Sequence, residues 1–389
     1  MKVFTWTLSG VALAASLACL PAAAQNTAPL KVGLMLPATG TFAALGTAIE
    51  NGFKLYVEEK GGKLGGRTVE FVKVDDESDP SKATDNMNKL VKRDNVDVVV
   101  GTVHSGVAMA MAKVAKDTGT MLIVPNAGAN AVTGPMCGNN IYRSSFTNSQ
   151  PGYAMGEALA KKGLKKVVTI TWKYAAGDES VGGFKEAFEK GGGSVVKELA
   201  VPFPNVEFQA LLTEIASIRP DAVYTFFAGG GAVKFVKDYA AAGLKNTIPL
   251  YGAGFLTDGT LEAQGAAADG IQTTLHYADS LNTPRDNAFR LAYAKAYKLQ
   301  PDVYAVQGYD AAQILSIGLA ATKGDIGKKD AFAAAVENAT VDSPRGPFKM
   351  SKSHNPIQDF YLREVKGKEN KVVSIASKGL VDPGRGCKM

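Results

Sequence analysis

Short runs of branched apolar residues alternate with longer segments of helical periodicity along most of the chain. In the segment 47–60, for example, Ile49, Phe53 and Val57 recur at i, i+4 and i+8, so they share one face of a helix. The runs with strand character are 31–36, 69–74, 97–100, 121–124, 166–171, 194–199, 222–227 and 248–251. Because helical segments separate these runs, the pattern predicts βαβ units and mostly parallel sheets covered by helices on both faces. This is the α/β fold class.

The predicted strands are too many for one small open sheet, so the pattern favours two sheets of similar architecture. The segment 144–151 has the composition of a linker and divides two series of strand–helix units. The segments 270–277 and 346–354 are further places where the chain is expected to cross between the two parts. We therefore expect two α/β lobes.

The first 24 residues have the pattern of a secretory signal peptide. Lys2 precedes an apolar stretch at 11–20, and the alanines 22–24 give the small-residue pattern of a cleavage site. We expect residues 1–24 to be removed, because the apolar stretch is too short to span a membrane as a stable helix. Cys19 follows a poor match to a lipidation motif, so whether it is lipidated remains open.

The composition is typical of a folded globular protein, with 46% hydrophobic and 21% charged residues. The formal net charge of +6 comes from single Lys and Arg residues scattered among acids. A nucleic-acid-binding surface usually clusters basic and aromatic residues, so we expect no nucleic-acid partner. Cys137 and Cys387 remain after processing, and an even pair in an oxidising compartment predicts a disulfide.

Several motifs of catalysis and cofactor binding are missing from the sequence. It has no Walker A motif, no GxGxxG after the first predicted strand, no HExxH and no serine elbow. A Ser–His hydrolase is disfavoured because Val103 stands where a nucleophile elbow needs glycine. The three histidines lie far apart in the sequence, which argues against a histidine metal site. We expect no cofactor and no enzyme activity.

Ligands of parallel sheets bind at the carboxyl ends of the strands, where loops lead into helices. Ser105 stands at the expected start of a helix, where its hydroxyl and free backbone amides suit a carboxylate; the alternative is an ordinary helix cap. The loop 124–129 exposes small residues whose amides can face a ligand. The further candidates in these and the other loops are Phe42, His104, Asn126, Ala127, Gly128, Tyr174, Phe227 and Phe255, with burial in the core as the alternative for Phe227.

The segments 31–40, 98–105, 123–127, 219–224 and 249–252, read together with the signal peptide, resemble type I periplasmic binding proteins, especially the leucine/isoleucine/valine-binding branch. The resemblance covers essentially the whole mature chain. It implies two Rossmann-like lobes joined by a hinge of three crossings, which close around one solute. It also implies a monomer in the periplasm that delivers this solute to ABC permease subunits in the inner membrane.

The resemblance also predicts how the chain is divided between the two lobes. The first lobe comprises 25–145 and 277–350, and the second comprises 146–276 and 351–389.

Residue by residue, the resemblance assigns the ligand carboxylate to Ser105, with Asn126 and Gly128 beside it. Amino-acid binders of this branch place an acid in the loop that matches 252–255, and this sequence has none there; the nearest is Asp258. An ammonium without a counter-charge in a closed cleft costs several kcal/mol. A branched-chain amino acid is therefore the weaker candidate.

Some relatives that this chain resembles take up benzoate- or phenylpropanoid-type acids. We accordingly predict an aromatic carboxylate as the ligand, held by an apolar pocket with a few polar groups. His104 is a candidate partner for a ring hydroxyl or the carboxylate, and Leu45 falls on an aromatic position of the family. A branched-chain amino-acid binder, a ligand-sensing receptor subunit and a secreted hydrolase remain the alternatives.

Overall fold

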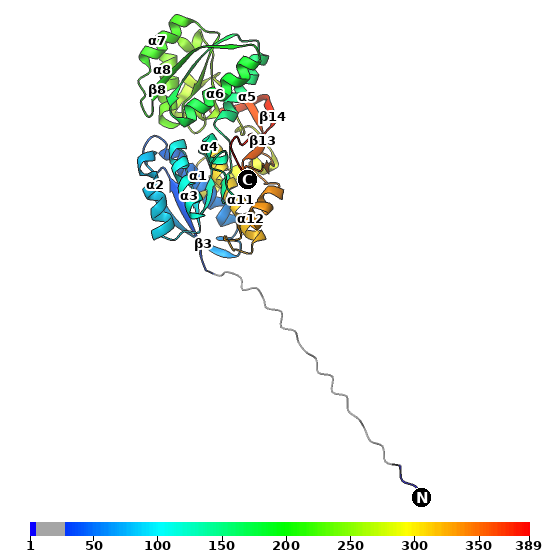
Figure 1. Cartoon of the computed structure of the whole chain (residues 1–389). Coiled ribbons are helices and arrows are strands. Elements are labelled where there is room, and N and C mark those ends of the chain that lie inside the picture. Colours follow the sequence, from blue (N-terminus) through cyan, green and yellow to red (C-terminus); the bar gives the residue numbers. More distant parts are fainter. Residues whose placement is uncertain (5–27) are drawn as a thin grey trace.

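The computed structural model describes residues 1–4 and 28–389. Residues 5–24 of the predicted signal peptide lie outside the described residues, so the structure does not test that prediction. The chain forms two α/β lobes, one above the other in Figure 1, each built around its own sheet. The predicted fold class is confirmed. No helix within the described residues is long and apolar enough to cross a membrane.

The first lobe contains a six-stranded sheet in the order β2-β3-β1-β4-β5-β6. The pairs β3–β1, β1–β4, β4–β5 and β5–β6 are parallel, and the short β2 runs antiparallel to β3. The central strands are continuous apolar runs because helices cover both faces of the sheet. The strands are β1 (Leu30–Leu36), β2 (Lys63–Leu64), β3 (Arg67–Asp75), β4 (Val98–Val100), β5 (Met121–Val124) and β6 (Ile141–Arg143).

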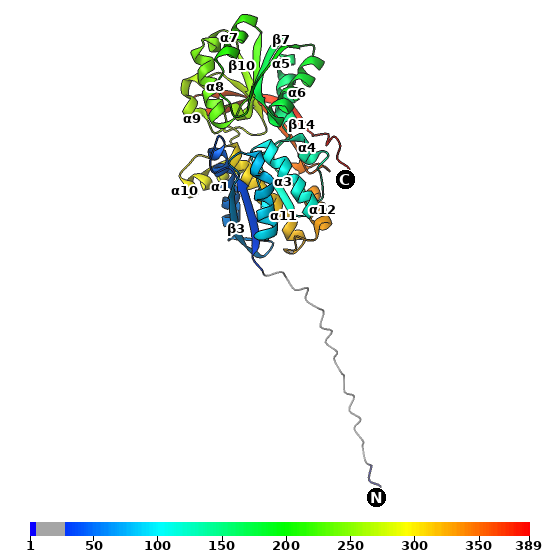
Figure 2. The same cartoon turned by 60° about the vertical axis from the view of Figure 1, so that its left-hand side comes forward.

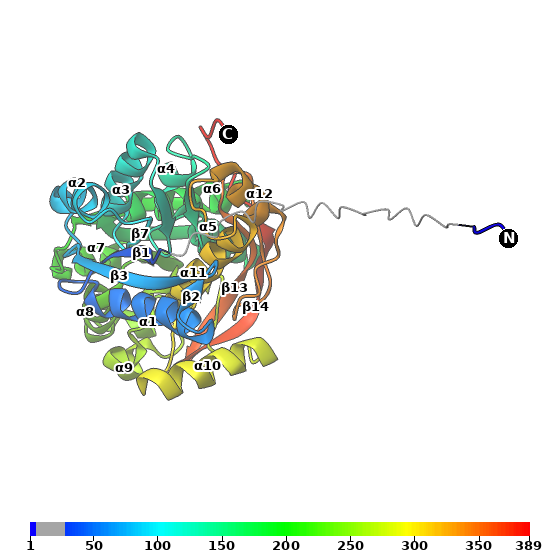
Figure 3. The same ribbon diagram turned by 90° about the horizontal axis from the view of Figure 1, so that it is seen from below.

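Helices from two distant parts of the chain cover this first sheet. They are α1 (Ala43–Glu59), α2 (Pro80–Asn88), the π-helical turn η1 (Lys89–Arg93), α3 (Ser105–Thr118), α4 (Asn130–Thr133), α10 (Pro284–Tyr297), α11 (Val303–Ala321) and α12 (Lys329–Asn338). Figure 3 shows α2 and α3 on one face and α1 and α11 on the other. The backbones of α1 and α11 almost touch, since a Cβ on Gly52 would lie 1.9 Å from the carbonyl oxygen of Ala305. Glycine therefore lets a late segment of the chain complete the first lobe.

The second lobe contains an eight-stranded sheet in the order β12-β13-β11-β10-β9-β7-β8, with β14 paired to β13. Strands β11, β10, β9, β7 and β8 are parallel, whereas β13 and β14 form a long antiparallel hairpin at one side. The strands are β7 (Lys166–Lys173), β8 (Ser194–Pro202), β9 (Ala222–Phe226), β10 (Leu250–Ala253), β11 (Gln272–Leu275), β12 (Lys349–Met350), β13 (Pro356–Lys366) and β14 (Glu369–Leu380).

Helices also pack on the second sheet, with α5 and α6 on one side and α7 and α8 on the other in Figure 2. The pair α5 and α6 is close-packed because a Cβ on Gly152 would lie 2.0 Å from the carbonyl oxygen of Ser180. The elements are α5 (Ser149–Lys161), α6 (Ala175–Lys190), α7 (Gln209–Ile218), α8 (Gly229–Ala241), α9 (Leu261–Gln264) and the 3-10 turns η2 (Leu244–Asn246), η3 (Gly254–Leu256) and η4 (Gly265–Ala268).

The chain passes between the two groups of elements from β6 to α5, from β11 to α10 and from α12 to β12. Half of the segment 270–277, expected to be a crossing, instead forms β11, because the residues of this strand pair with β10 on one side and β13 on the other. The residue boundaries predicted for the lobes stay a prediction.

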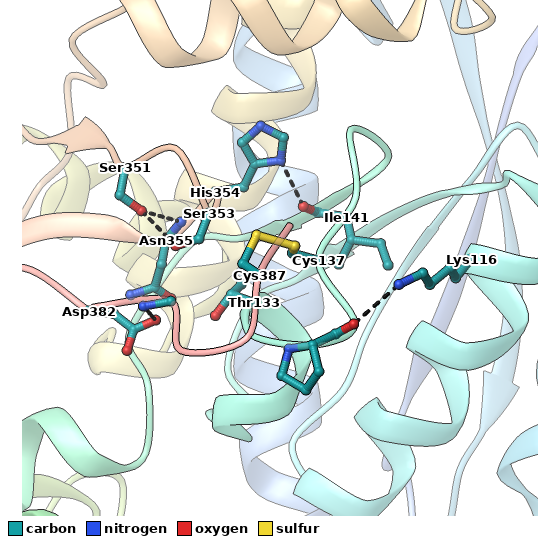
Figure 4. The surroundings of a disulfide bond; sticks show 12 residues. Lys116, Thr133, Cys137, Ile141, Ser351, Ser353, His354, Asn355, Asp382 and Cys387 are labelled. Atoms are coloured by element: carbon teal, nitrogen blue, oxygen red, sulfur yellow. Dashed lines mark hydrogen bonds between the residues drawn. A yellow bond between two sulfur atoms is a disulfide. The ribbon is translucent and has the colours of Figure 1, made fainter. Parts of the chain in front are cut away.

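The C-terminal tail returns from β14 of the second lobe to a loop of the first lobe. Cys137 and Cys387 form a disulfide with an S–S distance of 2.08 Å and a Cα–Cα distance of 5.5 Å (Figure 4). The tail packs closely there, since a Cβ on Gly134 would lie 2.7 Å from the carbonyl oxygen of Arg385. The disulfide thus adds a covalent link between the lobes to the three crossings.

Candidate ligand-binding site between the lobes

The carboxyl ends of the two sheets face each other across a small cavity of about 20 Å³. Loops that follow β1, β4 and β5 of the first lobe meet loops that follow β7, β9 and β10 of the second, and the first crossing and the start of α11 complete the wall. The lining residues are Phe42, Leu45, Val103, Ser105, Asn126, Gly128, Phe146, Asn148, Tyr174, Ala176, Phe226, Ala228, Phe255 and Tyr304.

The structure brings most of the predicted binding residues to this cavity. His104, Ala127 and Phe227 are predicted residues that do not line it. The predicted residues that do line it are Phe42, Ser105, Asn126, Gly128, Tyr174 and Phe255.

Phe227 is fully buried behind the cavity. Strand β9 ends at Phe226, and the alternation of side chains leaves Phe226 on the cavity side. The ring of Phe227 packs against Trp172 at 5.1 Å and Phe235 at 4.7 Å between ring centroids. Its place is in the core of the second lobe.

Ala127 has no free backbone group to offer a ligand. Its N–H donates to the carbonyl of Thr102 at 2.9 Å, and its carbonyl accepts from Nη1 of the buried Arg143 at 2.7 Å. These bonds hold the loop after β5 in place. The neighbouring Gly128 lines the cavity instead.

His104 is the helix cap of α3, since its Nδ1 accepts the backbone N–H of Gly106 at 3.0 Å. This bond makes Nδ1 an acceptor, so the neutral ring carries its hydrogen on Nε2. Burial lowers the pKa of His104 to about 4, and the charge of Asp79 only partly opposes this shift. The ring is therefore neutral at pH 7, stacks on Tyr174 at 4.8 Å and supplies no counter-charge to a carboxylate.

The polar end of the cavity is formed by Ser105 and its neighbours. Ser105 is buried at the first position of α3, where the helix dipole and unpaired amides favour a negative group. Its Oγ accepts a hydrogen bond from Nδ2 of Asn148 at 3.1 Å. Within residues 1–4 and 28–389, neither the backbone N–H of Ser105 nor that of Gly128 has a hydrogen-bond acceptor. Unpaired donors thus gather at one end of the cavity.

Asn126 lies beside this polar end and is held from the first lobe. Its Nδ2 donates to Oε1 of Gln307 on α11 at 2.7 Å. Its carbonyl oxygen lies 3.5 Å from the hydroxyl of Ser145 in the first crossing. Helix α11 therefore helps to fix the orientation of Asn126, a predicted binding residue.

Aromatic rings form the other end of the cavity. Phe255 lies 4.7 Å from Phe146 and 6.1 Å from Phe226 and Tyr304, all between ring centroids. Tyr304 is fully buried, and its hydroxyl has no hydrogen-bond partner among the described residues. A flat ring therefore finds aromatic faces and edges on several sides.

Sequence reasoning missed Phe146, Asn148 and Tyr304 as lining residues. Phe146 and Asn148 lie in the segment 144–151, whose composition predicts only a linker. Tyr304 lies on α11, far along the chain from the loops at the carboxyl ends of the strands. A sequence signal was present for the first two, because a crossing between lobes must pass the cleft.

No residue with a formal charge lines the cavity within the described parts of the chain. Asp258, the acid nearest in sequence to the loop after β10, is buried and engaged elsewhere. Its two carboxylate oxygens lie 3.3 and 2.6 Å from the guanidinium of Arg363, which also donates to the carbonyl of Tyr277 and the hydroxyl of Thr273. The carboxylate of Asp258 is therefore already neutralised by a buried partner.

A cluster of rings holds the lobes together at the rim of the cavity. Phe203, on the loop after β8, lies 5.5 Å from Phe42 and 4.8 Å from His104 of the first lobe. It also lies 5.1 Å from both Trp172 and Tyr174 of its own lobe. These contacts show the lobes pressed together, and a cavity of about 20 Å³ has room for a water but not for an aromatic acid. A larger solute is therefore accommodated only when the lobes lie further apart than in this structure.

Two larger grooves are lined mainly by polar and charged residues. One, of about 730 Å³, lies between α4, α5, α6 and the C-terminal tail, and the other, of about 720 Å³, lies beside α1 and α10. Neither contains the donors at the start of α3. In the described part of the chain no group of three or more His, Cys, Asp or Glu side chains is placed to hold a metal ion.

The cavity between two parallel-sheet lobes has the architecture of a solute-binding protein, and the comparison with known families decides the assignment. The family model for periplasmic binding proteins matches residues 29–370. The chain belongs to the periplasmic binding protein family. It is a solute-binding protein of the kind that serves ABC transporters, and its type I fold agrees with the resemblance seen in the sequence.

The relatives of the chain include a Leu/Ile/Val-binding protein homologue and solute-binding proteins crystallised with benzoic acids. It is 32% identical to the Leu/Ile/Val-binding protein homolog 6 of Brucella melitensis over 355 residues, which is 89% of this chain and 90% of that protein. It is 55% identical to a solute-binding protein of an ABC transporter from R. palustris in complex with benzoate, with a TM-score of 0.90 over 93% of this chain and 100% of that one.

A solute-binding protein from Rhodopseudomonas palustris BisB5, in complex with 3,4-dihydroxybenzoic acid, has 32% identity and a TM-score of 0.86 over 92% of this chain and 99% of that one.

Proposed function

We propose that this solute-binding protein captures a small aromatic carboxylate, of the benzoate or hydroxybenzoate type, in the cavity between its lobes. The observation that carries this proposal is the lining: aromatic rings at one end, neutral hydrogen-bond donors at the other and no charged residue among the described residues that line it. A leucine-type ligand would bring an ammonium into a site whose nearest acid in sequence, Asp258, is bound to Arg363. The similarity to two proteins crystallised with benzoic acids supports the same ligand class.

In this proposal the ligand carboxylate accepts hydrogen bonds from the hydroxyl of Ser105 and from the unpaired N–H groups at the start of α3 and at Gly128. Fixed donors and the positive end of a helix stabilise an anion without a full counter-charge. The ring lies among Phe146, Phe255 and their neighbours, where burial of apolar area contributes about 25 cal/mol per Å². Ligand contacts with both lobes then favour the closed form over the open one.

A thermal-shift titration with benzoate tests the role of Ser105. Benzoate raises the Tm of the wild-type protein, because it binds only the folded form. Ser105→Ala weakens benzoate binding by about 10- to 100-fold, the loss expected for one hydrogen bond to a charged group. Ser217→Ala, an exposed serine on α7, leaves the binding unchanged. Equal affinity of Ser105→Ala and wild type contradicts this assignment.

Further parts of the proposal concern cell biology. We infer secretion to the periplasm through the signal peptide 1–24, action as a monomer and delivery of the solute to ABC permease subunits. The hinge would then move 25–145 with 277–350 against 146–276 with 351–389. Binding and release without chemical change of the solute is the activity we propose.

A further inference from the structure

Asn148 occupies the first crossing between the lobes, directly before α5, and only 2% of it is exposed. Its backbone N–H donates to the carbonyl of Gly128 at 2.7 Å. A Cβ on Gly128 would lie 2.3 Å from Oδ1 of Asn148 and 2.8 Å from its backbone nitrogen. Glycine at 128 is therefore required for this approach, and it fixes Asn148 against the loop that follows β5.

The side-chain amide of Asn148 uses both of its hydrogens. Nδ2 lies 3.1 Å from Oγ of Ser105 in the first lobe and 2.8 Å from Oε2 of Glu179 on α6 of the second. An ionised carboxylate only accepts hydrogen bonds, so the contact with Glu179 requires the nitrogen of the amide on that side. One amide thus joins the proposed ligand anchor to the opposite lobe.

This arrangement determines where the hydroxyl hydrogen of Ser105 points. A hydroxyl has one hydrogen to donate, and it rotates to suit its neighbours. Because Oγ accepts from Asn148, its own hydrogen must turn away from that amide. No acceptor for this hydrogen is found within residues 28–389, and Ser105 lines the cavity. The free hydrogen is therefore available to the cavity.

We propose that Asn148 is a positioning residue that aims the Ser105 hydroxyl at the ligand carboxylate, and that its bond to Glu179 fixes the amide in the orientation that this requires. The inference rests on the proposed function of Ser105. Glu179 is well suited to the second role because its Oε2 also accepts the backbone N–H of Asn130 at 3.0 Å. One carboxylate oxygen of the second lobe thus holds both a backbone donor of the first lobe and the amide that orients the anchor.

A double-mutant cycle on benzoate affinity tests the link to Ser105. Asn148→Ala weakens binding about 10-fold when Ser105 is present and about threefold or less in the Ser105→Ala background, because no hydroxyl is left to orient. The same fold-loss in both backgrounds overturns the inference. Glu179→Ala also weakens binding, whereas Glu179→Gln, which keeps an acceptor oxygen, restores it. Equal losses in these two variants overturn the role of Glu179.

Asn140→Ala is the matched control for a lost buried asparagine. Asn140 is also buried, with Nδ2 donating to the carbonyls of Ala115 and Thr120 at 2.9 and 2.7 Å, but it does not line the cavity. Asn140→Ala lowers the Tm without changing benzoate affinity. If it loses as much affinity as Asn148→Ala, the inference is also overturned.

A second variant covers the case in which Asn148→Ala does not fold. Asn148→Asp keeps the size of the side chain but accepts the hydrogen of Ser105 instead of donating, so affinity falls at least as far as in the alanine variant; wild-type affinity overturns the inference. If wild-type protein gives no binding heat with benzoate, the proposed function fails. A wild type that binds, with an unaffected Asn148 variant, refutes only the positioning role.

Discussion

The double variant Cys137→Ser with Cys387→Ser removes the disulfide that ties the tail to the first lobe. The two cysteines are 250 residues apart in sequence. For a loop of that length, the chain-entropy relation gives about 5 kcal/mol of stabilisation through the unfolded state. The variant offsets part of this lost stabilisation, because without the disulfide the released tail gains conformational entropy in the folded state. We therefore expect a net loss of about 4 kcal/mol in the free energy of unfolding.

Differential scanning calorimetry of the mature protein measures this loss. With an unfolding entropy of about 2 cal/mol/K per residue, 4 kcal/mol lowers the Tm by about 5 °C in a chain of this size. Neither cysteine lines the cavity, so the direct contacts to the ligand stay in place. Wild-type protein kept reduced by a phosphine should have the same Tm as the double variant. This control separates loss of the disulfide from the effect of the two serines. A Tm within about 1 °C of oxidised wild type would refute the reasoning about the unfolded state.

Three other predictions follow from single residues. Burial raises the pKa of Asp76 from 3.8 to about 6, so its contribution to stability is fully present below about pH 4 and is lost as the pH rises through 6. In urea unfolding, the free energy of unfolding of Asp76→Asn should therefore depend less on pH between 4 and 7 than that of the wild type. An unchanged pH dependence contradicts this. Gly128→Ala should displace Asn148 and weaken benzoate binding in calorimetry, whereas Gly182→Ala, which has open space, should not. Tyr304→Phe removes a buried hydroxyl without a partner and should raise the free energy of unfolding by about 1 kcal/mol in urea titrations; a loss of stability contradicts it.

Apolar periodicity predicts the parallel parts of both sheets well, because those strands are buried on both faces. Strand β5, for example, occupies the predicted range 121–124. The antiparallel additions are harder to predict from local pattern. In β14, Val373 and Ile375 are exposed on a strand paired only with β13, so their apolar character does not report burial. Strand β11 was hidden because its threonines resemble linker residues.

The candidate site was predictable where it consists of loops at the carboxyl ends of strands. Ser105 and Phe255 follow β4 and β10, and that rule places them at the cleft. Phe227 is an exception to this rule. Side chains alternate in direction along a strand, so Phe227, one position after Phe226, points the opposite way. The roles of Asn148 and Tyr304 depend on tertiary packing between segments far apart in sequence, which no local pattern encodes.

Isothermal titration calorimetry of wild-type mature protein with benzoate and, separately, with leucine tests the central claim most directly. An uncharged, ring-lined cavity with neutral donors at one end predicts saturable heat with benzoate and none with leucine. Saturable binding of leucine with no heat from benzoate or hydroxybenzoates would contradict the account.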